Sequence, residues 1–249
     1  MTLDLSPAPG AAPPARRIAR HARTEALLLA RNGEQLLLAA VIPAATLVGG
    51  AIAGPRLGIG LGALAPSVLA LAIWSTAFTS CAIATGFDRR YQVLERLAAS
   101  PLRRSGLVAG KAAAIVIIVL AQVALLAAVA ALLGWRPALA PAAACSAALA
   151  VLAAVCAFVA GALILAGTLR AELTLACANL LYLAGLFAGI LPVGGAGWLG
   201  AVRWLPTGAL GEALRAAGAG HPDWLAVATL VAWAIVLTMI ARRVFRWTS

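Results

Sequence analysis

Three observations predict an all-α polytopic membrane protein. Apolar residues make up 63% of the 249 residues and charged residues only 11%, whereas soluble domains average about 45–50% and about 25%. The charged residues separate six uncharged runs, each long enough for a spanning helix of roughly 20 residues. The positive charges also gather in alternate connections between those runs. This composition excludes a soluble enzyme with an ordinary polar surface, and it excludes a disordered chain, which would need low hydrophobicity.

Six membrane-spanning helices are therefore expected in a permease domain over residues 35–249. Their positions follow from the uncharged runs: 36–54, 62–86, 112–133, 143–167, 173–191 and 224–241. An even number of spans places both termini on one side of the membrane. With both termini in the cytoplasm, the cytoplasmic segments hold 15 of the 19 Lys and Arg residues, as the positive-inside rule requires. The net charge of +11 then reports orientation and not nucleic-acid binding.

The segment before the first span divides into two parts. Residues 1–15 are rich in Pro and Ala, resemble no signal peptide, and are expected to be disordered. Residues 16–34 are expected to form an interfacial helix, because one arc of its surface is basic and the opposite arc carries Ile18 and Leu29. Glu25 and Leu27 interrupt that pattern, and a basic tail that merely sets topology is the alternative. The expected membrane-interface residues are Arg16, Arg20, Arg23 and Arg31.

The largest charged loop, residues 88–111, reads DRRYQVLERLAASPLRRSGLVAGK. Residues 88–99 can form about three helical turns, and Pro101 is expected to end them, because the residue before a proline disfavours the α region. A loop that only connects two spans could be much shorter. Its length therefore indicates a docking surface for a partner, and an ordinary solvated loop is the alternative.

The segment over residues 192–222 is rich in Gly and Pro but fairly apolar. Irregular backbone at membrane depth is tolerated only where protein or a cavity covers it. Trp198 and Trp204 suit the aromatic belt at a membrane surface. One or two short re-entrant or outer-leaflet helices are expected here, including one over 207–215.

No catalytic or metal-binding constellation is visible in the sequence. The cysteines form no CxxC motif, and His21 and His221 are each expected to be solvated or interfacial. The stretch Gly106–Ala112 fails as a phosphate loop, because its spacing is one residue short and no Ser or Thr follows Lys111. Neutral polar residues in the spans either line a substrate path or hydrogen-bond between helices. The path candidates are Thr79, Gln122 and Asn179.

Three motifs, in order, carry a family resemblance over most of the chain from about Arg31. They are RNGEQLLL followed by Ile42-Pro43; LERLAASPL followed by Gly110-Lys111; and FAGILP followed by WLPTG and EALR. With these motifs the chain resembles the type-2 ABC exporter permeases, which include daunorubicin-type drug-resistance permeases and polysaccharide exporters. One departure is clear. Members commonly read Arg-Glu-x-Gly-Thr before the Leu-Glu pair, where this sequence has Arg89-Arg90-Tyr91-Gln92-Val93.

The resemblance implies a permease subunit of the bacterial plasma membrane, with both termini cytoplasmic, that exports an amphiphilic drug, lipid or lipid-linked molecule. Its implied partners are two cytoplasmic ABC ATPase subunits and a second permease, identical or homologous. ATP and Mg belong to the ATPase subunit, and this chain needs no cofactor of its own. The helix in the charged loop would then be a coupling helix. The residues expected to face the ATPase are Glu95, Arg96, Leu97, Ser100, Pro101 and Leu102.

Two alternatives to the ATP-driven exporter stay open from the sequence. One is an ion-coupled or passive carrier that acts without an ATPase. The other is a non-transporting membrane assembly or scaffold protein. An ion-coupled carrier often keeps ionisable residues inside its spans, and none is expected there.

Overall fold

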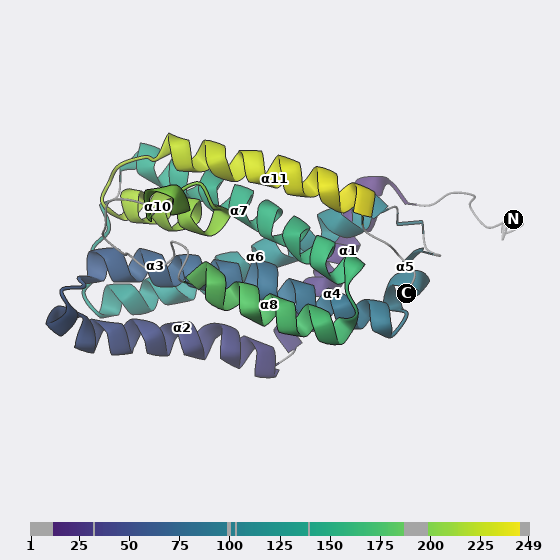
Figure 1. The fold of residues 1–249 in the computed structure, drawn as a ribbon, viewed down its shortest axis with the longest axis horizontal. Coiled ribbons are helices and arrows are strands. Elements are labelled where there is room, and N and C mark those ends of the chain that lie inside the picture. Colours follow the sequence, from purple (N-terminus) through teal and green to yellow (C-terminus); the bar gives the residue numbers. More distant parts are fainter. Residues whose placement is uncertain are drawn as a thin grey trace, which may run out of the picture.

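The computed structural model describes residues 12–31, 33–98, 101–102, 104–138, 140–186 and 199–244. In this part of the chain every regular element is helical, as the composition predicts, and the long helices form an elongated bundle (Figure 1). The elements are α1 (Pro14–Arg31), α2 (Gly33–Ala53), η1 (Gly54–Leu57), α3 (Leu61–Trp74), η2 (Ser75–Ser80), α4 (Cys81–Arg90), α5 (Val93–Ala98), α6 (Arg104–Leu132), α7 (Pro141–Thr168), α8 (Ala171–Gly185), α9 (Leu199–Val202), α10 (Pro206–Gly218) and α11 (Trp224–Val244).

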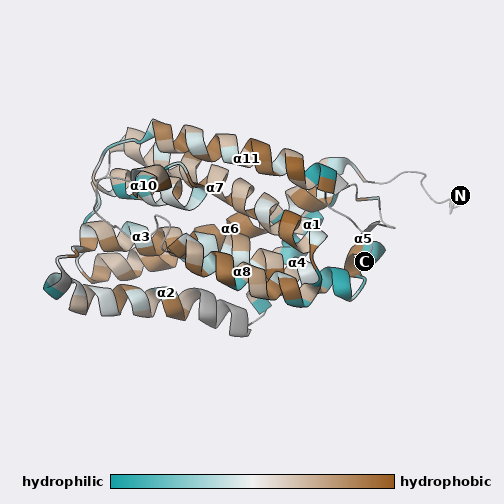
Figure 2. Cartoon of the chain, in the orientation of Figure 1, coloured by the Kyte–Doolittle hydropathy of each residue, from teal (hydrophilic) through white to brown (hydrophobic). Residues whose placement is uncertain are grey.

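Four helices among the described residues are long and apolar enough to cross a membrane. They are Leu61–Arg90, Ser105–Leu132, Pro141–Thr168 and Trp224–Val244. Two shorter apolar helices, Ala40–Arg56 and Ala171–Gly185, overlap the first and fifth predicted spans. Hydrophobic residues dominate the bodies of the long helices (Figure 2), and large apolar side chains such as Ile117 of α6 and Met239 of α11 are exposed on them. An apolar surface of this kind is suited to lipid or to another protein.

The second predicted span is one continuous helix of 30 residues, Leu61–Arg90, in which the π-helical segment η2 joins α3 to α4. At the junction of α3 and η2, the ring of Trp74 stacks on that of Phe78, with ring centroids 4.2 Å apart. The Trp74 ring also meets the ring of Phe158 in α7 edge-on, with a centroid distance of 4.6 Å. Helix α7 packs along α11 and α10, and Ala150, Ala154 and Ala157 are fully buried in it. Small side chains allow such close helix packing in membranes.

The charged loop differs from its prediction. Asp88–Arg90 continue α4, the chain turns at Tyr91 and Gln92, and only Val93–Ala98 form a separate helix. Helix α6 begins at Arg104, eight residues before the predicted third span. Lys111 was expected at the end of the charged loop, whereas it lies within α6 and its charge is paired inside the bundle.

At the far end of the bundle, the short helix expected over 207–215 is α10. Arg215 Nη1 donates to Ser67 Oγ at 3.0 Å, which fastens α10 to α3. Trp233 Nε1 of α11 donates to the Trp204 carbonyl at 2.8 Å. Residues 187–198, Trp198 among them, lie outside the described residues.

Candidate functional site

Helix α1 lies against the first turns of α6, at the end of the bundle that also holds α5 (Figure 1). Two glycines one turn apart on α6 permit this close contact. A Cβ at Gly110 would lie 2.4 Å from His21 Cδ2, and a Cβ at Gly106 would lie 3.5 Å from Ile18 Cγ1. Ala22, next to His21 on α1, is buried as well. Gly106 and Gly110, which in the sequence resemble part of a phosphate loop, therefore form the surface of α6 against which α1 packs.

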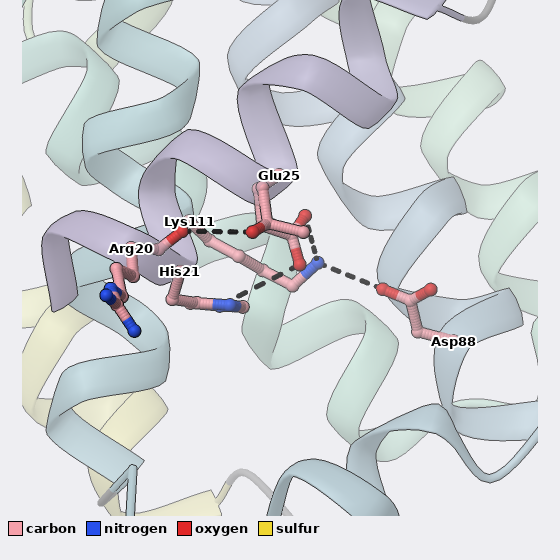
Figure 3. A network of polar contacts seen from close by, with 6 residues as sticks. Arg20, His21, Glu25, Asp88 and Lys111 are labelled. Atoms are coloured by element: carbon pink, nitrogen blue, oxygen red, sulfur yellow. Dashed lines mark hydrogen bonds and ion pairs between the residues drawn. The ribbon is translucent and has the colours of Figure 1, made fainter. Parts of the chain in front are cut away.

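A buried ion cluster joins three helices at this end. Lys111 Nζ of α6 donates to Asp88 Oδ2 of α4 at 2.9 Å and to Glu25 Oε2 of α1 at 3.2 Å (Figure 3). The Lys111 side chain is 4% exposed, Glu25 is 19% exposed and Asp88 is 30% exposed. A buried ammonium costs several kcal/mol unless it is paired and hydrogen-bonded. Lys111 therefore holds α1 and α4 together through its two carboxylate partners. We call Lys111, Asp88, Glu25 and His21 the ion cluster.

His21 is the fourth member of the cluster. Its Nε2 lies 3.7 Å from Glu25 Oε1 and has no hydrogen-bond partner among the described residues. Burial lowers the pKa of His21 below its ordinary value, Lys111 lowers it further, and Glu25 and Asp88 oppose the shift. Because the unfolded pKa is about 6.5 and the folded pKa is lower, acidification below about pH 6.5 favours the unfolded state at this residue. At neutral pH the cluster holds one ammonium, two carboxylates and a neutral imidazole.

A pocket opens beside the ion cluster, between α1, the η2–α4 segment and α6. It contains about 530 Å³ of empty space, including its mouth. Charged and hydroxyl groups line one part, and aliphatic side chains line the rest. The lining residues are Glu25, Leu29, Thr76, Ser80, Cys81, Ala84, Lys111, Ala114, Ile115 and Ile118.

The end of α4 is also fixed on its other sides. Arg89 Nη1 donates to the Ala166 carbonyl of α7 at 2.9 Å, and Arg90 pairs with Glu172 of α8. Arg17 of α1 donates to the Pro101 carbonyl in the segment that follows α5. Together with the Lys111–Asp88 bond, these contacts connect α4 to α6, α7 and α8. Only two residues, Tyr91 and Gln92, therefore separate α5 from the well-anchored end of α4.

The turn between α4 and α5 depends on Gln92, whose φ is +58°. This left-handed conformation costs a non-glycine residue roughly 1–2 kcal/mol, so glycine is the residue that suits it. Beyond the turn, Leu94 is fully buried and Val93 is exposed. Helix α5 thus has one face against the bundle and one face open.

A family model described as ABC-2 type transporter matches residues 15–217 of the chain. The chain belongs to the ABC-2 type transporter family. No curated protein is a significant match to it. The family match begins in α1 and ends in α10, so it includes the ion cluster, the pocket and α5.

In this ABC-2 chain the four arginines expected at a membrane surface share one face of α1. Arg16, Arg20, Arg23 and Arg31 are all exposed, and Ile18, Ala22 and Leu29 face the other way. Glu25, which interrupts the amphipathic pattern, is the residue through which the inner face binds Lys111. The expectation of a solvated or interfacial His21 is wrong, since its side chain is 9% exposed and lies in the ion cluster.

The residues expected to face an ATPase lie at this same end. Arg96 and Pro101 are exposed, Glu95 and Leu97 are half-buried, and Leu102 is buried against Gly106. Ser100 lies outside the described residues. The structure thus presents Arg96 and part of Glu95 on the open face of α5, while Leu97 and Leu102 contribute more to packing.

The three path candidates do not form one group within this chain. Gln122 of α6 is buried and accepts a 2.9 Å hydrogen bond from Thr76 Oγ1 of η2. Thr79, three residues further along η2, is buried with no hydrogen-bond partner for its hydroxyl among the described residues. Asn179 is exposed on α8. Thr76 and Gln122 lie 46 positions apart, so spacing along the sequence could not predict their contact.

Proposed function

We propose that this chain is the membrane subunit of an ATP-driven exporter in the bacterial plasma membrane, with six spans and both termini cytoplasmic. Two copies, or this chain and a homologue, would work with two cytoplasmic ABC ATPase subunits that bind ATP and Mg. The substrate would be an amphiphilic drug, lipid or lipid-linked molecule. Family membership supports the transporter subunit, and the distribution of positive charge supports the orientation.

The position of α5 is the main structural support for this proposal. Helix α5 follows an α4 end that polar contacts hold to α6, α7 and α8. A closing ATPase can shift the permease only if its contact with the permease differs between two states of the complex. A force on the open face of α5 would pass directly into the second and third spans. The exposed Arg96 and half-buried Glu95 provide charged groups for such a contact.

Purification from native membranes tests this function. The tagged full chain, extracted in a mild detergent, is expected to bring with it an ATPase subunit that contains a phosphate loop. After reconstitution, an amphiphilic substrate is expected to stimulate ATP hydrolysis, and ATP is expected to drive its export. Transport by the isolated chain with an ion gradient and no ATP would establish the carrier alternative. A stable complex that shows neither transport nor stimulated hydrolysis would establish the scaffold alternative.

A further inference from the structure

The pocket beside the ion cluster combines three observations that point to a ligand. It lies between three separate elements, α1, η2–α4 and α6, and it is open to the outside of the bundle. A charged side chain that is 4% exposed, Lys111, forms part of its wall. The π-helical segment η2 contributes Thr76 and Ser80 to the lining, and π-helical insertions often occur at functional sites.

The hydrogen bonds inside the cluster leave Glu25 Oε1, which faces the pocket side of the cluster, without a donor among the described residues. Lys111 Nζ is shared between Glu25 Oε2 and Asp88 Oδ2. Glu25 Oε1 has only the neutral His21 ring near it, at 3.7 Å, and receives no hydrogen bond from the described residues. A carboxylate oxygen in a partly buried site gains most from a cationic donor.

The charge of the cluster favours the same ligand. One ammonium faces two carboxylates, and the imidazole is neutral, so the group has an excess of one negative charge. The basic residues Arg16, Arg20 and Arg23 lie on the opposite, exposed face of α1. A ligand anion would therefore meet net repulsion at the pocket, whereas a cation would neutralise the excess charge.

The rest of the pocket is apolar. Leu29, Ala84, Ile115 and Ile118 line it without a further charged group. Mostly aliphatic walls with a few well-placed polar groups are typical of small-molecule binding sites. The lining suits a molecule with an amine at one end and a hydrocarbon chain that extends out through the open side of the pocket.

We propose that this pocket binds cationic amphiphiles, with the ligand ammonium on Glu25 and the hydrocarbon chain against the aliphatic residues of α6. This binding site goes beyond the proposed function, which assigns no ligand contact to any residue. Binding requires neither ATP nor the partner subunits, so the proposal stands or fails separately from the transport mechanism.

Photolabelling of the full chain in phosphatidylcholine nanodiscs tests the site. The probe is dodecylamine with a diazirine on its alkyl chain, and mass spectrometry locates the labelled residues. Labelling is expected on α6 near Ile115 and Ile118. Unlabelled dodecylamine is expected to compete at a concentration at least about tenfold lower than dodecanoic acid or dodecanol, because only the amine makes a charge-assisted hydrogen bond.

Two variants make the test specific. Glu25→Gln is expected to reduce labelling roughly tenfold, while the matched control Glu212→Gln, at the far end of the bundle, keeps it. Ile118→Trp retains every charge and fills the apolar part of the pocket, so it is also expected to reduce labelling. If Glu25→Gln does not fold, Ile118→Trp still tests whether the probe binds in this pocket. Three results would overturn the proposal. They are labelling of Glu25→Gln equal to that of the native chain, competition by dodecanoic acid equal to that by dodecylamine, and labels spread evenly over the exposed faces of α2 and α8.

Discussion

Replacing Lys111 with methionine is expected to lower the free energy of unfolding by about 2–4 kcal/mol. Methionine leaves Glu25 and Asp88 beside each other with no cation between them, and removal of one partner from a buried pair costs roughly 3–5 kcal/mol. We expect a smaller loss because both carboxylates are partly exposed. Thermal unfolding in detergent measures the effect, as a fall in Tm of roughly 5–15 °C.

A neutral cluster is the matched control for Lys111→Met. Adding Glu25→Gln and Asp88→Asn to the lysine variant removes the two unbalanced charges. The triple variant is therefore expected to recover most of the lost Tm. If the Lys111→Met variant were as stable as the native chain, the cluster would not hold α1, α4 and α6 together.

Reversing the charges of Glu95 and Arg96 is expected to uncouple ATP hydrolysis from export. Placing like charges opposite a partner's charges costs several kcal/mol at an interface, so coupled transport should fall about tenfold or more. ATP hydrolysis and membrane insertion should persist, because neither residue takes part in the ion cluster. Parallel measurements of hydrolysis and export in proteoliposomes check this.

The control for the α5 variant reverses two charges at the other end of the bundle. Arg56 and Arg136 are exposed there, and glutamate at both positions is expected to leave coupling unchanged. Coupled transport at the native rate in the Glu95 and Arg96 variant would remove α5 from the contact with the ATPase.

Hydropathy in the sequence was sufficient to predict an all-helical membrane chain but not the ion cluster. Long uncharged runs predict helices because each needs an apolar surface for lipid or for the core. The same rule places Lys111 in a loop, since an isolated lysine is costly inside a membrane protein. Its partners Asp88 and Glu25 lie 23 and 86 residues away. No local pattern shows which distant carboxylates would neutralise it.

In the interfacial helix, too, the sequence pattern could not show which groups are paired in the fold. Its periodicity predicted the exposed arginines correctly, but Glu25 counted only as an interruption of an apolar face. That inner face contacts α6, so its polar groups are satisfied by protein, and amphipathic analysis does not distinguish a protein neighbour from lipid. The conformation of Gln92 likewise depends on the turn between α4 and α5, where the residue type gave no signal for φ > 0.

Crosslinking from α5 tests most directly the claim that a separate ATPase drives this permease through that helix. A photoreactive amino acid replaces Arg96 in the tagged chain, and the matched variant has the same amino acid at Arg136, at the opposite end. After irradiation of native membranes, we expect an adduct between position 96 and a subunit with a phosphate loop, and no such adduct from position 136. Adducts from both positions, or from neither while transport is intact, would contradict it.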